Sequence, residues 1–424
     1  MRPSLSDLNL KGLSEMKRRF LLLVAVAAFP AFNISCGNPY SPTIEYVTEH
    51  DTIVVRDTVR VRDTVQIRDV IEIRDTIRDT IVIRENVEKC DIVNEGARKF
   101  LDEVDYSADT AYTVSFVNEY YKNQGATDKP LPVTISWPEG TASKVVMSTD
   151  PDFYRTIEVE GSESPVKVYN LIPGVDYFYK VVDSNGKVLK SGCVQPVGPL
   201  RMINGVADNV RDLGGWEVPG GHVAYGKIYR GAKLSSRMSS SAKDIFLNQL
   251  GIKLDLDLRG IKDSEATVGP VVEGADYIKF PVEKNLGRGT GNTQELYQQA
   301  IRTVIAYLSE GKPVYFHCAG GADRTGSLAF LIEALVGVSE SDMSKDYEMT
   351  TFARSNKRWR NFRATEDETH ILYELITHIR KFGNPKTDSV NQLVENWATT
   401  RHSPDVDPLT KEEIALLRKY LIVK

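Results

Sequence analysis

The feature that most constrains the fold of this chain is the run VYFHCAGGADRTGSLAFLIEAL, which begins at Val314. Its first residues predict a short buried strand, and the adjacent glycines predict a tight loop. The apolar stretch that follows predicts a buried helix. Strand-like and helix-like runs alternate from Leu200 onward, so we expect an α/β domain with a partly parallel sheet flanked by helices. In such sheets ligands bind at the carboxyl ends of the strands, which is where this loop would lie.

The loop carries a cysteine and an arginine at a spacing that suits phosphate chemistry. Cys318 and Arg324 form the pattern C-x5-R, with His317 just before the cysteine and Thr325 just after the arginine. Sulfur attacks as a thiolate, and an ordinary thiol ionises only near pH 8.5. A helix N-terminus, successive backbone N–H groups and Arg324 all favour the thiolate. The same groups bind the oxygens of a phosphate dianion, so the spacing predicts that the loop binds phosphate and attacks it with sulfur.

The residues between the cysteine and the arginine are expected to bind phosphate through their backbone. Two glycines let the chain turn its amides inward where a Cβ would obstruct it. Successive amides would then form a nest for the anion, together with the guanidinium. The predicted phosphate-binding residues are Ala319, Gly320, Gly321, Ala322 and Arg324.

Four segments, in the same order, resemble one family. HCAGGADRTG is similar to the loop HCxAGKDRTG of the bacterial cysteine-dependent tyrosine and dual-specificity (tyrosine/lipid) phosphatases. NVRDLGGW (Asn209–Trp216), IYRGAKLS (Ile228–Ser235) and LDLRG with Glu265 resemble the other segments of that family. The resemblance covers residues 200–424.

Carried over by position, the resemblance implies a role for each residue of the loop. Cys318 would be the nucleophile that forms a phosphocysteine, and Arg324 would bind the phosphoryl oxygens. Thr325 would stabilise the sulfur as it leaves in the second step. His317 is expected to orient the loop by hydrogen bonding, with a purely structural role as the alternative.

The resemblance also implies a general acid and bears on the substrate. In this family the acid can be the aspartate just before the arginine, which is Asp323 here. This assignment suits the sequence, because the segment PVEKN lacks the aspartate of the mobile acid loop of other tyrosine phosphatases. Glu283 is the alternative acid. Ala322 replaces a lysine that the family associates with extra anionic charge on the substrate, which disfavours phosphoinositides and inositol phosphates. Other basic side chains could substitute for that lysine, namely Lys233, Lys284, Arg288, Arg354 and Arg358.

The remaining family segments predict supporting residues. Arg211 and Asp212 are expected to brace the active loop through an ion pair rather than to touch the substrate. Arg259 and Glu265 are expected to form a structural pair. The basic cluster Arg354–Arg363 is interpreted as a solvated helix face rather than as a rim for an acidic substrate.

The amino-terminal segment, residues 1–36, resembles an export signal. Met16-Lys17-Arg18-Arg19 precedes an apolar run of about 13 residues, shorter than the roughly 20 that a spanning helix needs. Ser35 then precedes Cys36, as in a bacterial lipoprotein signal whose cysteine is acylated after cleavage, although Asn33 stands where an aliphatic residue is usual. We therefore expect lipidation at Cys36 and a protein of the cell envelope, either periplasmic or anchored to the outer membrane.

Residues 37–90 are predicted to form a stalk or a poorly ordered linker. Hexads such as RDTVRV and RDTVQI repeat between residues 48 and 84 and put apolar residues at alternate positions, which is strand periodicity. The β-branched residues favour an extended chain, but identical copies can slip in register.

Residues 91–107 predict a short helical connector, and residues 108–199 predict an all-β sandwich of short strands. Strand-like runs include AYTVSFVNEYY, PVTISWPE and SKVVMSTD. Trp137 and the segment NLIPGVDYFYKV resemble the fibronectin type III pattern, which implies a spacer or a binding module without chemistry of its own. Cys90 and Cys193 flank this domain, and we hypothesise that a disulfide joins them in an exported protein.

Composition narrows the class of function. A formal net charge of −5 gives no sign of a nucleic-acid binder, and the four cysteines form no CxxC pair, so neither a metal nor a cofactor is predicted. The predicted function is an exported phosphatase that acts on phosphotyrosine or related phosphate monoesters, carried by a protein or a small molecule, with the membrane contacted through the lipid anchor. The alternatives are a phosphoinositide or inositol-phosphate phosphatase, an envelope binding protein with a vestigial phosphatase domain, and, less favoured, a sulfurtransferase or arsenate reductase.

Overall fold

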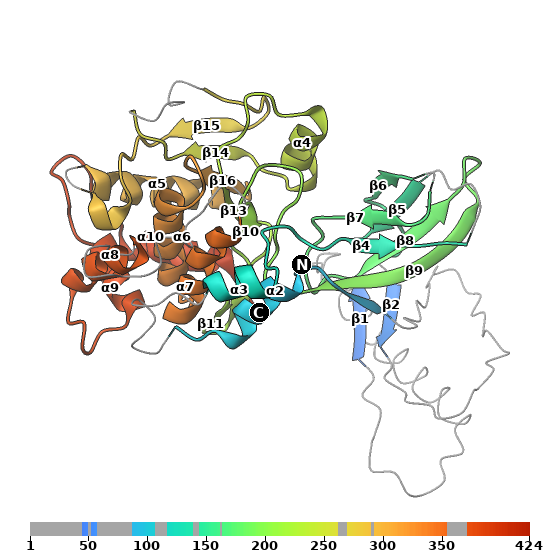
Figure 1. Ribbon diagram of the computed structural model, residues 1–424, viewed down its shortest axis with the longest axis horizontal. Helices are drawn as coiled ribbons and strands as arrows, with labels where there is room; N and C mark the ends of the chain where they lie inside the picture. Colours follow the sequence, from blue (N-terminus) through green and yellow to red (C-terminus); the bar gives the residue numbers. More distant parts are fainter. Residues whose placement is uncertain are drawn as a thin grey trace, which may run out of the picture. The chain divides into compact units, whose positions relative to one another are not determined.

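The computed structural model describes residues 45–49, 52–56, 87–106, 117–138, 144–161, 163–261, 269–289, 292–353 and 371–424 (Figure 1). The chain divides into two compact units, Met1–Arg84 and Glu85–Lys424. The predicted signal peptide with Cys36, most of the hexads, Glu265 and the cluster Arg354–Arg363 lie outside the described residues.

The first unit contains one described hairpin. Strands β1 (Glu45–Glu49) and β2 (Thr52–Arg56) pair antiparallel, with Glu49 opposite Thr52. Strand β2 coincides with the first of the hexads, where β-branched residues favour an extended backbone.

The amino-terminal part of the second unit contains a five-stranded sheet and a two-stranded one. Along β8, Tyr177, Tyr179 and Val181 are buried and alternate with partly exposed residues, so one face of the sheet packs on a core. The strand order is β3-β9-β8-β5-β6 in the larger sheet, and β4 pairs with β7 in the smaller. The strands are β3 (Glu88–Asp91), β4 (Val133–Ile135), β5 (Lys144–Ser148), β6 (Ile157–Glu160), β7 (Val166–Val168), β8 (Tyr177–Val182) and β9 (Val188–Val197).

Three features of this region differ from the sequence-based expectations. Strand β3 spans the end of the predicted stalk and the first residue of the predicted connector, but it pairs in parallel with β9 and so belongs to the sheet. The run AYTVSFVNEYY becomes helix α3 (Val117–Asn123) from Val117 on, because Val117 and Tyr120 share one buried face at helical spacing. The predicted disulfide is wrong: no disulfide joins Cys90 to Cys193, and the register places Cys90 opposite Pro196, three residues farther along β9.

The carboxyl-terminal part is built on a second five-stranded sheet of order β10-β13-β16-β14-β15. Its last four strands run parallel and β10 runs antiparallel to β13, which confirms the predicted α/β class with a partly parallel sheet. The strands are β10 (Arg211–Asp212), β13 (Ile228–Gly231), β14 (Leu254–Asp257), β15 (Asp276–Lys279) and β16 (Val314–His317). A small sheet joins β11 (Glu217–Val218), β12 (Gly221–Val223) and β17 (Ile422–Val423).

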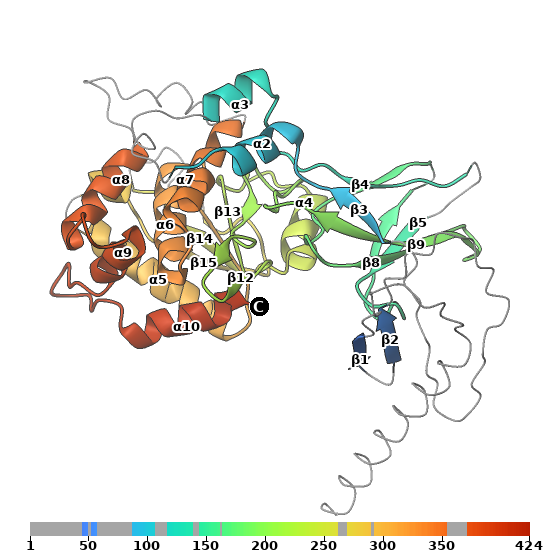
Figure 2. The ribbon, with the colours of Figure 1, turned by 90° about the horizontal axis from the view of Figure 1, so that it is seen from below.

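Helices cover both faces of this sheet (Figures 1 and 2). Val314 and Phe316 belong to the apolar core that also holds α5 and α6, whereas Tyr315 between them belongs to a second core with Phe246. Strand β16, predicted as a short buried strand, is therefore buried on both faces. The described α-helices of this carboxyl-terminal part are α4 (Ser240–Asp244), α5 (Thr293–Ser309), α6 (Asp323–Val336), α7 (Glu340–Met349), α8 (Ile371–Ile379), α9 (Val390–Ala398) and α10 (Lys411–Leu421).

The helices that precede the sandwich pack on this α/β part (Figure 2). The predicted connector helix is present as α2 (Glu95–Glu103). Its Phe100 meets Phe352 edge to face, with ring centroids 5.3 Å apart, and Tyr106 donates a hydrogen bond of 2.6 Å to Glu348. Buried residues of α2 and α3 therefore belong to the same apolar core as the α/β part, and the predicted boundaries at residues 108 and 200 stay predictions. Among the described residues, no helix has the length and apolarity required to cross a bilayer.

Candidate active site

The loop at Cys318 connects the end of β16 to the start of α6. Strand β16 ends at His317, and the helix begins at Asp323, so the loop lies at a helix N-terminus. Gly321 has φ of +67°, and a Cβ there would lie 2.3 Å from the carbonyl carbon of Gly231. The tight turn therefore requires glycine at this position, both for its backbone conformation and for its lack of a side chain.

Cys318 lies in surroundings that favour its thiolate, although its side chain is only 3% exposed. Burial opposes ionisation, but the charge of Arg324, the hydroxyl and N–H of Thr325 and the N–H of Ala322 outweigh it, so the pKa of the thiol is lowered. Thr325 is fully buried, and its hydroxyl has no oxygen or nitrogen partner within the described part of the chain. That hydroxyl is therefore available to the sulfur.

His317 fixes the start of the loop. Its Nε2 lies 3.0 Å from Oδ1 of Asp255, and its Nδ1 lies 3.0 Å from the carbonyl oxygen of Cys318. Burial acts to lower its pKa, but Asp255, Asp257 and the Cys318 carbonyl raise it further than burial lowers it, and the net shift is upward. A protonated ring donates from both nitrogens, and in that form His317 would hold the backbone at the nucleophile.

The two candidate acids stand in different surroundings. Asp323 begins α6 beside the loop, and its Oδ1 accepts a 3.0 Å hydrogen bond from the hydroxyl of Tyr347, which is buried. Glu283 is exposed, and its Oε1 accepts a 2.7 Å hydrogen bond from the N–H of Ile261. Arg324 reaches this second segment, because its Nη1 donates to the carbonyl of Val282 at 3.1 Å.

The carbonyl groups of the loop are held from outside. Nδ2 of Asn209 donates to the carbonyls of Gly320 at 3.2 Å and Gly321 at 3.0 Å, and Nη2 of Arg230 donates to Gly321 at 3.0 Å. The N–H of Lys233 donates to the carbonyl of Ala319 at 3.2 Å. Because a trans peptide directs its C=O and N–H to opposite sides, these bonds turn the following N–H groups inward.

A buried charged cluster supports these contacts. Asp346 on α7 pairs with both Arg211, at 2.7 Å, and Arg230, and all three side chains are buried. Arg211 also donates to Oδ1 of Asn209 at 2.7 Å, so it braces the loop through that residue. Burial acts to raise the pKa of Asp346, but the two guanidiniums hold it below its usual range. Burial and the neighbouring Asp346 raise the pKa of Glu333 on α6 well above its usual range, which favours its neutral form.

The geometry corrects the predicted pairing of Arg211 with Asp212. Arg211 pairs with Asp346, whereas Asp212 pairs with Arg201 at 3.0 Å and accepts from the N–H groups of Gly214 and Gly226. Asp212 therefore stabilises a turn rather than the loop. Arg259 contacts Asp257 at 2.7 Å, and Asp257 also lies near His317. The expected partner Glu265 lies outside the described residues, so its pairing with Arg259 stays a prediction.

Sequence reasoning missed several supporting residues. Arg230 lies in the family-like segment IYRGAKLS, so its position was a usable signal, but its partner Asp346 lies on a helix with no recognisable motif. Tyr347, which holds Asp323, also had no signal. Of the basic side chains expected to replace the missing lysine, Arg288 is paired with Glu374 at 3.0 Å, and Lys233 lies beside the loop through its backbone.

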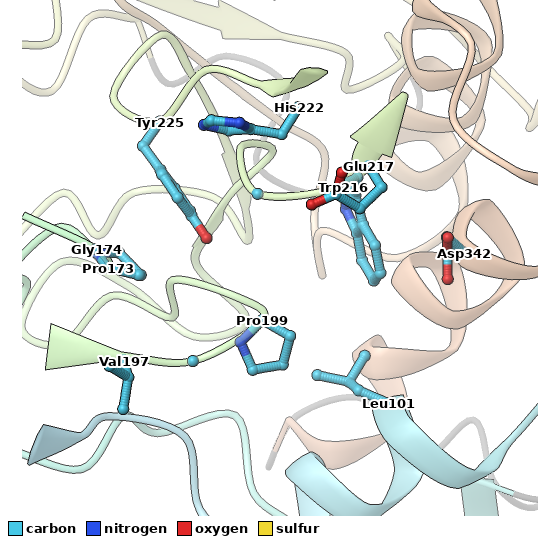
Figure 3. A pocket seen from close by; sticks show the side chains of 12 residues that line it. Leu101, Pro173, Gly174, Val197, Pro199, Trp216, Glu217, His222, Tyr225 and Asp342 are labelled. Atoms are coloured by element: carbon cyan, nitrogen blue, oxygen red, sulfur yellow. The ribbon is translucent and has the colours of Figure 1, made fainter. Parts of the chain in front are cut away.

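A cavity of about 520 Å³ lies apart from the loop (Figure 3). Its lining includes Trp216, Glu217, His222, Tyr225 and Asp342 and contains no lysine or arginine. A phosphate dianion needs basic groups or converging amides, so this cavity does not suit it, whereas the loop at Cys318 does. In the described ranges, no group of three or more His, Cys, Asp or Glu side chains is placed to hold a metal ion.

Comparison with known proteins identifies matches over the carboxyl-terminal part. Residues 203–421, more than half of the chain, match the model of the tyrosine phosphatase family. A Cupriavidus necator protein, provisionally named a tyrosine-protein phosphatase, is 29% identical over 181 residues, covering 37% of this chain and 63% of its own. A tyrosine-protein phosphatase of Nostoc commune is 28% identical over 136 residues, covering 27% of this chain and 45% of its own. This chain thus spans less than two thirds of the length of either relative.

Among solved structures, the core catalytic domain of the PP-IP phosphatase SIW14 from S. cerevisiae, in complex with citrate, is 20% identical to this chain. That match covers 34% of this chain and 85% of the solved one, with a TM-score of 0.24.

Proposed function

The chain belongs to the tyrosine phosphatase family, and we propose that it is an exported phosphatase that hydrolyses phosphate monoesters, phosphotyrosine or related esters, through a phosphocysteine intermediate. The observation that carries this proposal is the buried Cys318, whose pKa is lowered although its burial opposes that shift. Arg324 and converging backbone amides produce the shift, and the same groups bind a phosphate dianion.

In the first step the Cys318 thiolate attacks the phosphorus. A P–S bond forms while the P–O bond to the leaving group breaks, and the leaving oxygen takes a proton from Asp323. Arg324 and the inward N–H groups of the loop bind the equatorial oxygens, where charge is concentrated in the transition state. The hydroxyl of Tyr347 holds the Asp323 carboxyl beside the loop.

In the second step water attacks the phosphocysteine. The P–S bond breaks, inorganic phosphate is released, and Asp323 takes back a proton from the water. The sulfur leaves as a thiolate, which the buried hydroxyl of Thr325 and the charge of Arg324 stabilise. The groups that lower the pKa of the free thiol therefore also lower the barrier to its departure.

The substrate class follows from the charge around the loop. Ala322 supplies no cation where the family carries a lysine, and Arg288 is paired with Glu374. A substrate with one phosphate, such as phosphotyrosine, therefore fits better than a phosphoinositide or an inositol polyphosphate.

The rest of the chain suits a tethered envelope enzyme. We take residues 1–36 as a lipoprotein-type signal with acylation at Cys36, and the sandwich as a fibronectin type III-like spacer. The buried Trp137 and a 3.1 Å hydrogen bond from the N–H of Ile172 to the hydroxyl of Tyr177 support that view of the sandwich. Labelling with a radioactive fatty acid in a bacterial host, compared between wild type and Cys36→Ala, tests the anchor. Equal labelling of both proteins would refute it.

Turnover of the purified protein tests the function. Wild type should release phosphate from a phosphotyrosine peptide faster than from phosphoinositides or inositol phosphates, and Cys318→Ser should abolish release while leaving the unfolding transition unchanged. Denatured wild type trapped during turnover should carry phosphate on Cys318. Retained turnover in Cys318→Ser would exclude the phosphocysteine route, and preferred hydrolysis of phosphoinositides would favour the alternative substrate class.

A further inference from the structure

Asp128 lies outside the region that matches the family, yet its carboxylate contacts the backbone that supports the loop. Its Oδ2 accepts a 2.9 Å hydrogen bond from the N–H of Asn209, and Asp128 is only 7% exposed. The family match begins at residue 203, so Asn209 belongs to the matched region and Asp128 precedes it by many residues.

Asn209 has an unusual backbone conformation that orients its side chain. Its φ is +58°, in the left-handed region that non-glycine residues seldom occupy and that asparagine tolerates best. Its side chain then donates to the carbonyls of Gly320 and Gly321 and to the hydroxyl of Thr350. Asn209 is itself 1% exposed, so its N–H has no access to water and depends on Asp128 for an acceptor.

The contact with Gly321 reaches the nucleophile through one peptide unit. The carbonyl of Gly321 and the N–H of Ala322 belong to the same planar peptide and point in opposite directions. Holding that carbonyl outward therefore points the N–H of Ala322 at the sulfur, and this N–H is one of the groups that lower the pKa of Cys318. The chain of contacts thus runs from Asp128 through Asn209 to the thiolate.

We propose that Asp128 is a positioning residue for the phosphate-binding loop, because it holds Asn209 in the conformation that turns the loop amides toward sulfur and phosphate. The inference rests on the proposed function and extends it: a segment before the family-matched region completes the active site.

Asp128 is itself held in place, as a positioning residue must be. Asn94, which caps helix α2, donates from Nδ2 to the carbonyls of Thr127 at 2.8 Å and Lys129 at 3.2 Å, one on each side of Asp128. Lys129 Nζ lies 3.4 Å from the Asp128 carboxylate and supplies a counterion. The carboxylate therefore reaches Asn209 from a preorganised turn rather than from a loose loop.

Full-length variants at Asp128 test the proposal. Asp128→Ala removes the acceptor and should lower kcat/KM for a phosphotyrosine peptide about tenfold, in line with one lost hydrogen bond to a charged group. Asp128→Asn keeps an acceptor oxygen and should stay within about threefold of wild type. Asp183→Ala is the matched control, because Asp183 likewise accepts from backbone N–H groups but in the turn between β8 and β9, and it should leave turnover unchanged.

The reactivity of Cys318 separates positioning from simple stability and from turnover. Alkylation of Cys318 by iodoacetamide is followed by mass spectrometry on the peptide that contains Cys318. The pH profile of the alkylation rate should move to higher pH in Asp128→Ala and not in Asp128→Asn. Protection of Cys318 by inorganic phosphate should weaken in parallel. Should Asp128→Ala fail to fold, Asp128→Glu, which displaces the carboxylate by one methylene, carries the same expectation.

Two results would overturn the proposal. One is an Asp128→Ala protein with wild-type turnover and an unchanged alkylation profile. The other is a loss of activity that only tracks the unfolded fraction, with the profile of the folded protein unmoved. If wild type hydrolyses no phosphate ester at all, the proposed function fails, whereas the alkylation profiles still decide whether Asp128 positions the loop.

Discussion

In the buried charged cluster beneath the loop, we predict that Glu333 can replace Asp346 as the ionised carboxylate. Arg211 and Arg230 lower the pKa of Asp346 and favour its ionised form, whereas burial and Asp346 raise the pKa of Glu333 and favour its neutral form. In these favoured forms the four groups together carry one net positive charge. In Asp346→Asn the repulsion that keeps Glu333 protonated disappears, and the two guanidiniums then favour its ionisation.

The expected energies follow from this exchange. Breaking a buried ion pair by removing one partner costs about 3–5 kcal/mol. Ionised Glu333 would offset part of that cost, so Asp346→Asn alone should destabilise the protein by about 2 kcal/mol. Glu333→Gln replaces a neutral carboxyl by a neutral amide and should cost less than about 1 kcal/mol. The double variant has no carboxylate left and should lose the full cost, which gives a coupling of about 1–3 kcal/mol.

Urea unfolding of the four proteins at pH 7, followed by circular dichroism, measures this double-mutant cycle. The double variant should be less stable than the sum of the single changes predicts. If Asp346→Asn costs the same in both backgrounds within about 0.5 kcal/mol, Glu333 does not replace the lost charge and the reasoning fails.

Four further predictions concern the loop and the domain boundary. Asp323→Asn should lower kcat on alkyl phosphates by about 10²–10⁴ and less on p-nitrophenyl phosphate, whose leaving group needs little protonation; equal losses would argue against Asp323 as the acid. Thr325→Val should move the alkylation profile of Cys318 to higher pH, because hydroxyl donation favours the thiolate, whereas Thr325→Ser should not. Because the pKa of His317 is raised in the folded state, the folded protein holds a proton that the unfolded chain releases above about pH 6.5. The difference in free energy of unfolding between wild type and His317→Gln should therefore be largest below that pH. It should shrink as the pH rises through the pKa of His317 in the folded protein. A difference in stability that does not change with pH would contradict a protonated His317 in the folded protein. A chain that starts at Leu200 should lose cooperative unfolding because it lacks α2 and α3, whereas one that starts at Glu85 should keep it; equal transitions would refute a shared core.

The fold was largely predictable where the hydrophobic pattern of a single element indicates its secondary structure. The apolar run at Val314 predicted a short buried strand, and the structure shows that its two faces contact separate cores. The run AYTVSFVNEYY misled, because its β-branched and aromatic residues favour strands, while the packing of Tyr120 against Phe100 stabilises a helix. Strand β3 was missed because four residues after a repeat carry too little pattern, and its pairing with β9 is a long-range contact.

The residues of the loop itself were predictable from spacing, but their support was not. The geometry around Cys318 depends on one rigid glycine-rich turn, and a turn of that kind is visible in the sequence. Asp346, Tyr347 and Asp128 act from distant segments, and no local pattern links them to the loop. Arg211 was expected to brace the loop, yet its neighbour Asp212 is directed toward Arg201, since adjacent residues on a strand point to opposite faces.

The arrangement explains how a loop without the family's lysine can still favour an anion. Ala322 removes a mobile surface cation, but the buried cluster retains two guanidiniums against one carboxylate, directly bonded to the loop through Gly321. A buried charge is screened less by salt and solvent than a lysine at the rim. It also cannot reach a second phosphate group on the substrate, because Arg230 is wholly enclosed. The buried cluster therefore supports the binding of one phosphoryl group in the loop, which agrees with the substrate class that we propose.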